Sequence, residues 1–272
     1  MVTGTPYDSP SRPQVIDGTY LALPTVVPMT RAAIVVLAGG SGSRVGATDA
    51  RGATLNKVYL PVAGRPLLAW SLDAAARTPG VARLILVVRA DDAPTAHRLL
   101  AEYPCALPVE VVTGGDSRHR SEEAAVRHLA LAIRAGELDV VAIHDGARPL
   151  ADPALFAEVI TTAAESGGAV PAVAAGPLVE ATGPGGTSSG AHRQPVRLVR
   201  VQTPQAFRAA GLLDAFAAAA RDGAEGTDTA STVEQFSDLV IQAVAGSATN
   251  LKVTYPADAT VAEALLARRA SA

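Results

Sequence analysis

The feature that most constrains this chain is a repeating order of short β-branched runs and Ala-rich stretches. The apolar runs are 33–37, 84–88, 109–112 and 140–143, and the stretches 67–77, 94–102 and 121–134 have the composition and spacing of helices. Runs that are apolar along their whole length indicate strands buried on both faces, which is typical of parallel sheets covered by helices. The order therefore predicts a doubly wound α/β domain with a mostly parallel sheet.

Composition changes divide the chain into three parts. Residues 1–30 are rich in Pro, Ser, Thr and Gly and are expected to form a disordered extension ahead of a compact domain over 31–272. A Gly, Pro and Ser-rich stretch at about 176–200 is too long for an ordinary loop, so we expect a projecting arm. Beyond it the pattern predicts a helix at 208–221, strands at 239–244 and 250–253, and a last helix at 257–268.

Charge and cysteine content exclude several classes of protein. The 272 residues carry 23 basic and 26 acidic side chains, a net charge of -3, so no general attraction to nucleic acid or to an anionic membrane is expected. Cys105 is the single cysteine, which excludes an intrachain disulfide and fits a reducing compartment. No apolar run reaches the roughly 18 residues of a membrane span. These features predict a soluble, cytoplasmic protein.

A Gly-rich segment follows the first apolar run. Its sequence is Ala38, Gly39, Gly40, Ser41, Gly42, Ser43 and Arg44. Backbone N–H groups of such a segment can approach a polyphosphate closely, and an arginine adds a planar fork of donors. The segment is neither a Walker loop nor a G-x-G-x-x-G fingerprint, and on its glycines alone a tight turn without a ligand stays open.

Lys57 follows thirteen residues after Arg44, directly before a Pro-x-x-Gly-x-Pro-Leu segment at 61–67 and a predicted helix. An isolated lysine is usually a solvated surface charge. The whole combination of glycine loop, arginine, lysine and helix resembles the nucleotidyltransferase superfamily, which makes nucleoside-diphosphate sugars and alcohols. That resemblance implies a Rossmann-like fold.

Five further motifs narrow the resemblance. They are Gly-Gly-Asp-Ser-Arg-His-Arg-Ser at 114–121, His-Asp-Gly-Ala-Arg-Pro at 144–149, Thr-Pro-Gln-Ala-Phe at 203–207, Thr-Asp-Thr-Ala-Ser at 227–231 and Asn-Leu-Lys-Val-Thr-Tyr-Pro-Ala-Asp at 250–258. In this order they resemble the 2-C-methyl-D-erythritol 4-phosphate cytidylyltransferase family, from about Ala32 to the end of the chain. The resemblance implies an enzyme of the non-mevalonate isoprenoid pathway that joins CTP to a small polyol phosphate and releases pyrophosphate.

The resemblance also implies roles for individual residues. Arg44 and Lys57 would stabilise the transition state, and Lys252 would bridge the phosphates as a third catalytic cation. Such cations suit the reaction, because its main difficulty is repulsion between anions. The residues expected to bind CTP are Ala38, Gly39, Gly40, Gly42, Ser43, Gly115, Asp116, Ser121 and Gly146. Ser121 can also cap the helix predicted at 121–134, and the charges of Arg118, His119 and Arg120 are of a kind that is usually solvated.

Asp145 is the predicted ligand of Mg²⁺. It ends an apolar run, so it should lie at the edge of the sheet where a carboxylate can hold the metal against a triphosphate. A helix cap is the alternative for Asp145, but Asp152, just ahead of Pro153, is the better candidate for a cap. His144 is expected to be a packed histidine. The five histidines and one cysteine show no zinc-ligand spacing.

The acceptor side departs most from the family pattern. The resemblance implies acceptor binding by Arg148, Thr182, Arg197, Thr203 and Thr227, and a homodimer in which each arm reaches the neighbouring acceptor pocket. Thr182 stands one position late, and Pro195 occupies the place of the usual arm arginine, which leaves Arg193 or Arg197. Three functions therefore stay open: a methylerythritol phosphate enzyme, a cytidylyltransferase for another polyol phosphate such as ribitol 5-phosphate, and a non-catalytic nucleotide-binding regulator.

Overall fold

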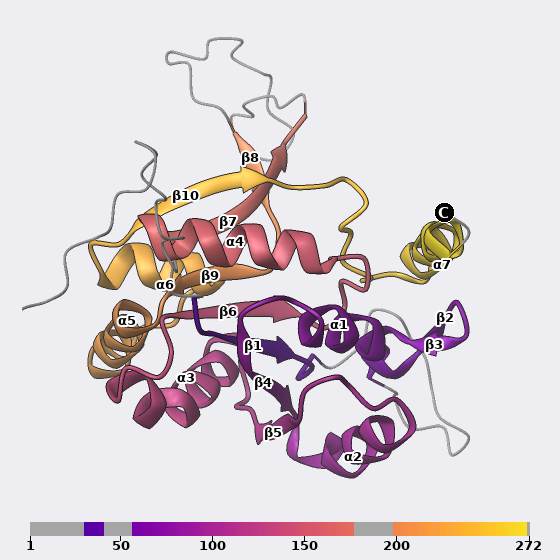
Figure 1. The fold of residues 1–272 in the computed structure, drawn as a ribbon, viewed down its shortest axis with the longest axis horizontal. Helices are drawn as coiled ribbons and strands as arrows, with labels where there is room; N and C mark the ends of the chain where they lie inside the picture. The colour runs from indigo at the N-terminus through magenta and orange to yellow at the C-terminus, as the bar shows by residue number, and fades with distance from the viewer. Residues whose placement is uncertain (1–29, 41–55, 177–197, 271–272) are drawn as a thin grey trace, which may run out of the picture.

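The fold is built on one large sheet with helices on both faces (Figure 1). The computed structural model describes residues 30–40, 56–176 and 198–270. Within these ranges eight strands join in the order β10-β7-β9-β6-β1-β4-β5, with β8 paired to β7. The strands are β1 (Ala32–Leu37), β4 (Val81–Val88), β5 (Val109–Thr113), β6 (Val140–Asp145), β7 (Gly167–Ala174), β8 (Val199–Val201), β9 (Gln205–Arg208) and β10 (Val240–Ala245).

The sheet is mostly parallel, as predicted. β1 pairs in parallel with both β4 and β6, β4 with β5, and β10 with β7. β9 is antiparallel to both of its neighbours, β6 and β7, and β8 is antiparallel to β7. Sequence periodicity did not predict β7, β8 or β9, because two of these strands are short and β7 begins with two glycines.

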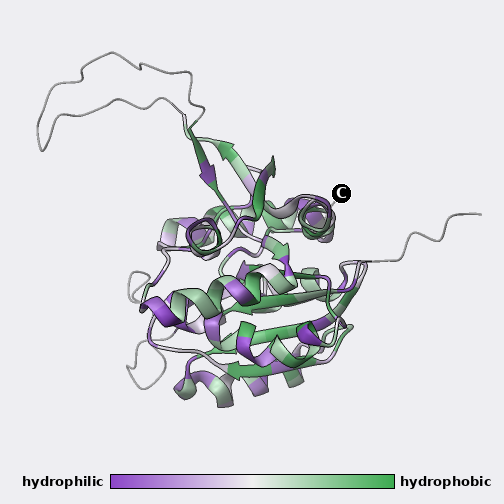
Figure 2. Cartoon of the chain, turned by 90° about the vertical axis from the view of Figure 1, so that its left-hand side faces the viewer, coloured by the Kyte–Doolittle hydropathy of each residue, from purple (hydrophilic) through white to green (hydrophobic). Residues whose placement is uncertain are grey.

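Helices cover the two faces in two groups (Figure 1). α1 (Leu67–Ala76), α2 (Ala93–Glu102) and α4 (Pro153–Ser166) pack on one face, and α3 (Arg118–Arg134), α5 (Ala209–Asp222) and α6 (Thr229–Phe236) pack on the other. The strand β1 feeds both cores, with Ile34 and Val36 in the first and Ala33 and Val35 in the second. Its unbroken apolar run is thus explained by burial on both sides, and apolar strands lie between the helical layers in Figure 2.

A smaller cluster joins the end of the chain to the body. α7 (Pro256–Ala270) packs near the hairpin of β2 (Pro61–Val62) and β3 (Arg65–Pro66), and Leu266 of α7 shares a buried cluster with Val62 and Val253. The segment 250–253 was predicted to be a strand, and this was wrong. It forms no ladder, and the Val253 N–H donates to the carbonyl of Ala147 at 2.9 Å instead. Lys252 therefore lies on an irregular segment.

The helix α3 begins at Arg118, earlier than predicted. Its N-cap is Ser117, whose Oγ accepts from the Arg120 N–H at 3.1 Å. Ser121 therefore lies inside the first turns and is not the cap. Asp152 caps α4, as predicted, and accepts from the Leu155 N–H at 2.9 Å.

The predicted arm begins where β7 and β8 leave the body. These two strands pair from Ala172–Val201 to Ala174–Val199 and project away from the helical layers (Figure 2). Most of the arm, 177–197, lies outside the described residues, as does the predicted N-terminal extension up to residue 29. No helix in the described part of the chain has the length and apolar character to cross a membrane.

Candidate functional site

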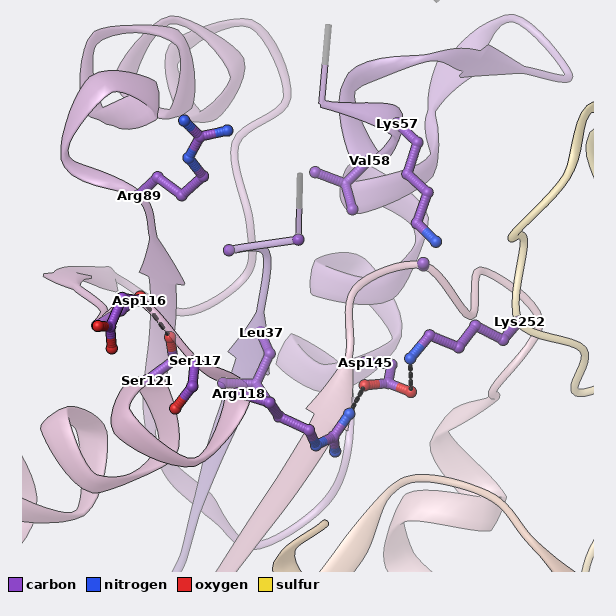
Figure 3. A pocket seen from close by; sticks show the side chains of 14 residues that line it. Leu37, Lys57, Val58, Arg89, Asp116, Ser117, Arg118, Ser121, Asp145 and Lys252 are labelled. Atoms are coloured by element: carbon purple, nitrogen blue, oxygen red, sulfur yellow. Dashed lines mark hydrogen bonds and ion pairs between the residues drawn. The ribbon is translucent and has the colours of Figure 1, made fainter. Parts of the chain in front are cut away.

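A cavity of about 530 Å³ lies at the carboxyl ends of β1 and β6, beside the start of α3. Ligands of open α/β sheets bind at this edge, because the loops that follow parallel strands meet there. Figure 3 shows the cavity and its side chains. It is lined by Leu37, Gly39, Gly40, Lys57, Val58, Arg89, Gly115, Asp116, Ser117, Arg118, Ser121, Asp145, Ala147 and Lys252.

Eight of the residues predicted from the sequence meet at this cavity. They are Gly39, Gly40, Lys57, Gly115, Asp116, Ser121, Asp145 and Lys252. Ala38 and Gly146 are buried just behind the lining. The predictions for Gly42, Ser43, Arg44, Thr182 and Arg197 fall outside the described residues.

Asp145 is the centre of the charged groups. Its Oδ1 accepts from Arg118 Nη1 at 2.5 Å, and its Oδ2 lies 3.0 Å from Lys252 Nζ (Figure 3). Oδ2 also lies 3.4 Å from Arg148 Nε. Burial by itself would raise the pKa of Asp145, but the three cations outweigh it and hold the pKa well below its usual range. Asp145 is therefore an ionised carboxylate, and the next helix, α4, is capped by Asp152 instead.

Arg148 and Thr203 hold Asp145 from outside the cavity lining. Arg148 Nη1 donates to the carbonyl of Asn250 at 2.8 Å, which ties the Lys252 segment to the end of β6. The Asp145 N–H donates to Thr203 Oγ1 at 3.0 Å. Neither side chain lines the cavity, so their predicted contact with an acceptor stays a prediction.

His144 is a packed histidine, as expected. Its ring lies 4.9 Å from the ring of Phe156, and its two nitrogens lie near Thr203 Oγ1 and the carbonyl of Arg148. Burial lowers the pKa of His144 to about 4, so it is neutral at pH 7. A neutral ring adds no further charge beside Asp145.

Asn56 determines where Lys57 stands. The buried Asn56 side chain donates to the carbonyl of Ala38 at 2.6 Å and to Asp92 Oδ2 at 3.0 Å. It thereby holds the short helix η1 (Lys57–Tyr59) against the exit of β1. The sequence offered one signal for this role, since Asn is a preferred N-cap residue and Asn56 caps η1.

The turn into α3 requires glycine. A Cβ on Gly115 would clash with the Cβ of Arg120, and a Cβ on Gly114 would lie 2.6 Å from Ser121 Oγ. This close approach lets Ser121 Oγ donate to the Gly115 carbonyl at 3.4 Å and brings Asp116 to the cavity wall. The Gly-Gly-Asp motif is therefore a packing requirement as well as a candidate binding segment.

Arg118 was missed as a site residue. It was expected to be solvated like its neighbours, but its side chain is only 28% exposed, lines the cavity and pairs with Asp145 and Glu122. The spacing of Arg118 and Glu122, four residues apart on a helix, was the available signal. Arg120, by contrast, pairs with Glu123 and Glu225 near the surface.

Two other predictions fall away from the cavity wall. Thr227 is exposed ahead of α6, and its hydroxyl donates to Ser231 Oγ at 3.4 Å. Gly146, predicted to bind CTP, lies behind the wall, and a Cβ there would lie 3.0 Å from both the Leu37 carbonyl oxygen and Leu68 Cδ1. That is a tight contact, so alanine would require these neighbours to shift.

Asp145 is the described residue best suited to hold a divalent metal. No cluster of three or more metal-ligating side chains occurs in the described ranges. Mg²⁺ needs no such cluster, because it is usually bound by one or two carboxylates together with waters and substrate phosphates. A carboxylate has about four lone-pair positions, and the three cations use three of them, so Oδ1 keeps one position for a metal.

Known proteins resemble this chain over most of its length. The family model of 2-C-methyl-D-erythritol 4-phosphate cytidylyltransferase matches residues 32–268. Curated proteins of that name from Cereibacter sphaeroides (strain KD131) and Acidobacterium capsulatum are 40% and 35% identical, covering 88% and 89% of this chain and 98% and 99% of theirs. The crystal structure of that enzyme from Thermus thermophilus has 30% identity and a TM-score of 0.62, over 87% of this chain and 98% of that one. This chain therefore belongs to the 2-C-methyl-D-erythritol 4-phosphate cytidylyltransferase family of nucleotidyltransferases.

Proposed function

We propose that this chain transfers the cytidylyl group of CTP to 2-C-methyl-D-erythritol 4-phosphate and releases pyrophosphate. The observation that carries the proposal is that the family match over 32–268 coincides with a cavity where Lys57, Lys252 and Asp145 meet. The product would serve the non-mevalonate route to isoprenoid precursors.

The reaction exchanges one phosphorus–oxygen bond for another. An oxygen of the acceptor phosphate bonds to the α-phosphorus of CTP, and the bond from that phosphorus to the pyrophosphate oxygen breaks. The attacking phosphate is already largely ionised at pH 7, so no general base is needed. Lys57, Arg118 and Lys252 line the cavity and would offset the repulsion between the two anions.

Magnesium is the metal that we assign to this site. Asp145 would hold it with the phosphates of CTP, where it would neutralise charge on the triphosphate. The place of Asp145 in the cavity wall supports this, because its carboxylate lines the space that the triphosphate would occupy. Activity that survives complete removal of divalent cations with EDTA would remove magnesium from the proposal.

We also assign a homodimer, in the cytoplasm. In support of the dimer, three apolar side chains at the root of the arm, Leu198, Val199 and Val201, are about half exposed. Exposed apolar side chains that gather in one place are typical of surfaces that another chain covers. A second copy could cover them and bring its own arm to the acceptor side of the cavity.

The experiment is a coupled assay of pyrophosphate release. The enzyme would be given CTP, UTP, ATP or GTP with either 2-C-methyl-D-erythritol 4-phosphate or ribitol 5-phosphate. We expect release only with CTP and the methylerythritol phosphate. Faster pyrophosphate release with ribitol 5-phosphate would reassign the acceptor. CTP binding without pyrophosphate release in any combination would favour a non-catalytic nucleotide-binding regulator.

A further inference from the structure

A second carboxyl group lies fully buried beside the cavity, and the proposed cytidylyl transfer assigns it no role. The side chain of Glu122 is 1% exposed, and its Oε1 accepts from Arg118 Nε at 2.8 Å. Its other oxygen, Oε2, has no hydrogen-bond partner within the described part of the chain. Burial of an acidic group with a single cationic partner is costly, so its presence calls for a function.

Arg118 joins this carboxylate to the centre of the site. Its guanidinium donates from Nε to Glu122 and from Nη1 to Asp145, so two carboxyl groups hold one planar group from two sides. A guanidinium has five N–H donors, and these two bonds leave three of them. Because Arg118 lines the cavity, donors remain for an anion bound there (Figure 3).

We propose that Glu122 is a positioning residue, which fixes the Arg118 guanidinium so that it both holds Asp145 and faces the phosphates of the bound nucleotide. The inference rests on the proposed function, since it takes the nucleotide to be CTP. Glu122 itself does not touch the cavity and acts through Arg118.

The protonation state of Glu122 does not remove this bond. Burial, helped by the negative charge of Asp145, raises the pKa of Glu122 to about 7, against the opposing effects of Arg118 and the nearby Thr229 hydroxyl. In either state Oε1 can accept from Arg118 Nε, because a neutral carboxyl keeps an acceptor oxygen. A glutamine therefore imitates the neutral form and should keep the position of Arg118.

The test compares Glu122→Gln with Glu122→Leu. We expect Glu122→Leu to raise the CTP dissociation constant about tenfold, the loss typical of a charge-assisted hydrogen bond, whereas Glu122→Gln stays within about threefold. Binding is measured by calorimetry and turnover by pyrophosphate release. Glu122→Leu leaves the buried Arg118 without one of its two anionic partners, so its melting temperature should fall, and binding is compared at a temperature at which all variants are folded.

A double-mutant cycle with Arg118→Lys separates positioning from packing. Lysine cannot bridge both carboxylates, so Glu122→Leu should weaken CTP binding by less than about twofold in that background. Glu123→Gln, on the same helix but paired with Arg120 and Arg127, is the matched control and should bind CTP normally.

Three outcomes would overturn the inference. These are unchanged CTP binding in Glu122→Leu, equal losses in the leucine and glutamine variants, or the same loss with Arg118 and with lysine at position 118. If the wild-type enzyme binds CTP but does not turn over, the proposed function fails, while the binding cycle still tests Glu122.

Discussion

The cavity at the end of β6 and the root of the arm at β7 and β8 differ in how far their side chains find partners within one chain. Around the cavity one chain supplies both signs of charge, and Asp145 has three cationic partners within 3.4 Å. At the root of the arm Val199 and Val201 are 47% and 44% exposed. This difference supports our proposal that one chain binds the nucleotide and that a second copy completes the acceptor side.

The largest expected effect comes from a substitution in the cavity. Lys57→Ala should lower turnover by about 100-fold or more with a modest loss of CTP binding, because donors that act mainly on the transition state contribute little to ground-state binding. Single-turnover pyrophosphate release measures this. Arg127→Ala, which removes an exposed cation of α3, is the control. Unchanged turnover would remove Lys57 from the site.

Lys252→Ala should have a smaller and mixed effect. Lys252 lines the cavity and pairs with Asp145, so we expect a higher KM for CTP and a lower kcat, each by about tenfold. Steady-state kinetics separate the two, and Lys252→Arg should recover part of both. A change in kcat alone would mean that Lys252 acts only on the transition state.

Substitutions at the root of the arm test the proposed dimer. Val199→Glu combined with Val201→Glu should give a monomer in sedimentation and lower kcat/KM for the acceptor by about tenfold, a loss of roughly 1.4 kcal/mol, while CTP binding stays unchanged. Val240→Glu, an exposed apolar position on β10, is the control. A fully active wild-type monomer, or a monomeric double variant that keeps the wild-type kcat/KM for the acceptor, would contradict the proposed dimer.

The smallest effect concerns stability. Burial raises the pKa of Glu122 to about 7 from its ordinary value of 4.5, so the folded state binds more protons than the unfolded state between these values. The Glu122 contribution therefore destabilises the protein progressively as pH rises through this window and levels off above it. Glu122→Gln should gain at least about 1 kcal/mol on the wild type between pH 5 and pH 8. Urea unfolding measures the difference, and a constant difference across pH would refute it.

Local sequence determined the frame of the molecule. The β-branched runs predicted β1, β4, β5 and β6, and the Ala-rich stretches predicted the helices between them, because apolar periodicity follows directly from burial. The motifs also predicted that Lys57, Asp145 and Lys252 belong together, and they now lie around one cavity.

Only the tertiary structure decided which charged side chains pair with each other in the cavity and which pair at the surface. Arg118 carries the same charge as Arg120, yet one faces Asp145 while the other pairs near the surface with Glu225. Asn56 likewise has a role that depends on distant partners, the Ala38 carbonyl and Asp92. Glu122 has a local partner, Arg118, and its role depends on the contact of that arginine with the distant Asp145. The sequence by itself determined the alternating strands and helices of the first half and the gathering of Lys57, Asp145 and Lys252 at the sheet edge, since both follow from local patterns. Which charges become buried, and what their pKa values are, depends on contacts between distant segments, and these exist only in the folded chain.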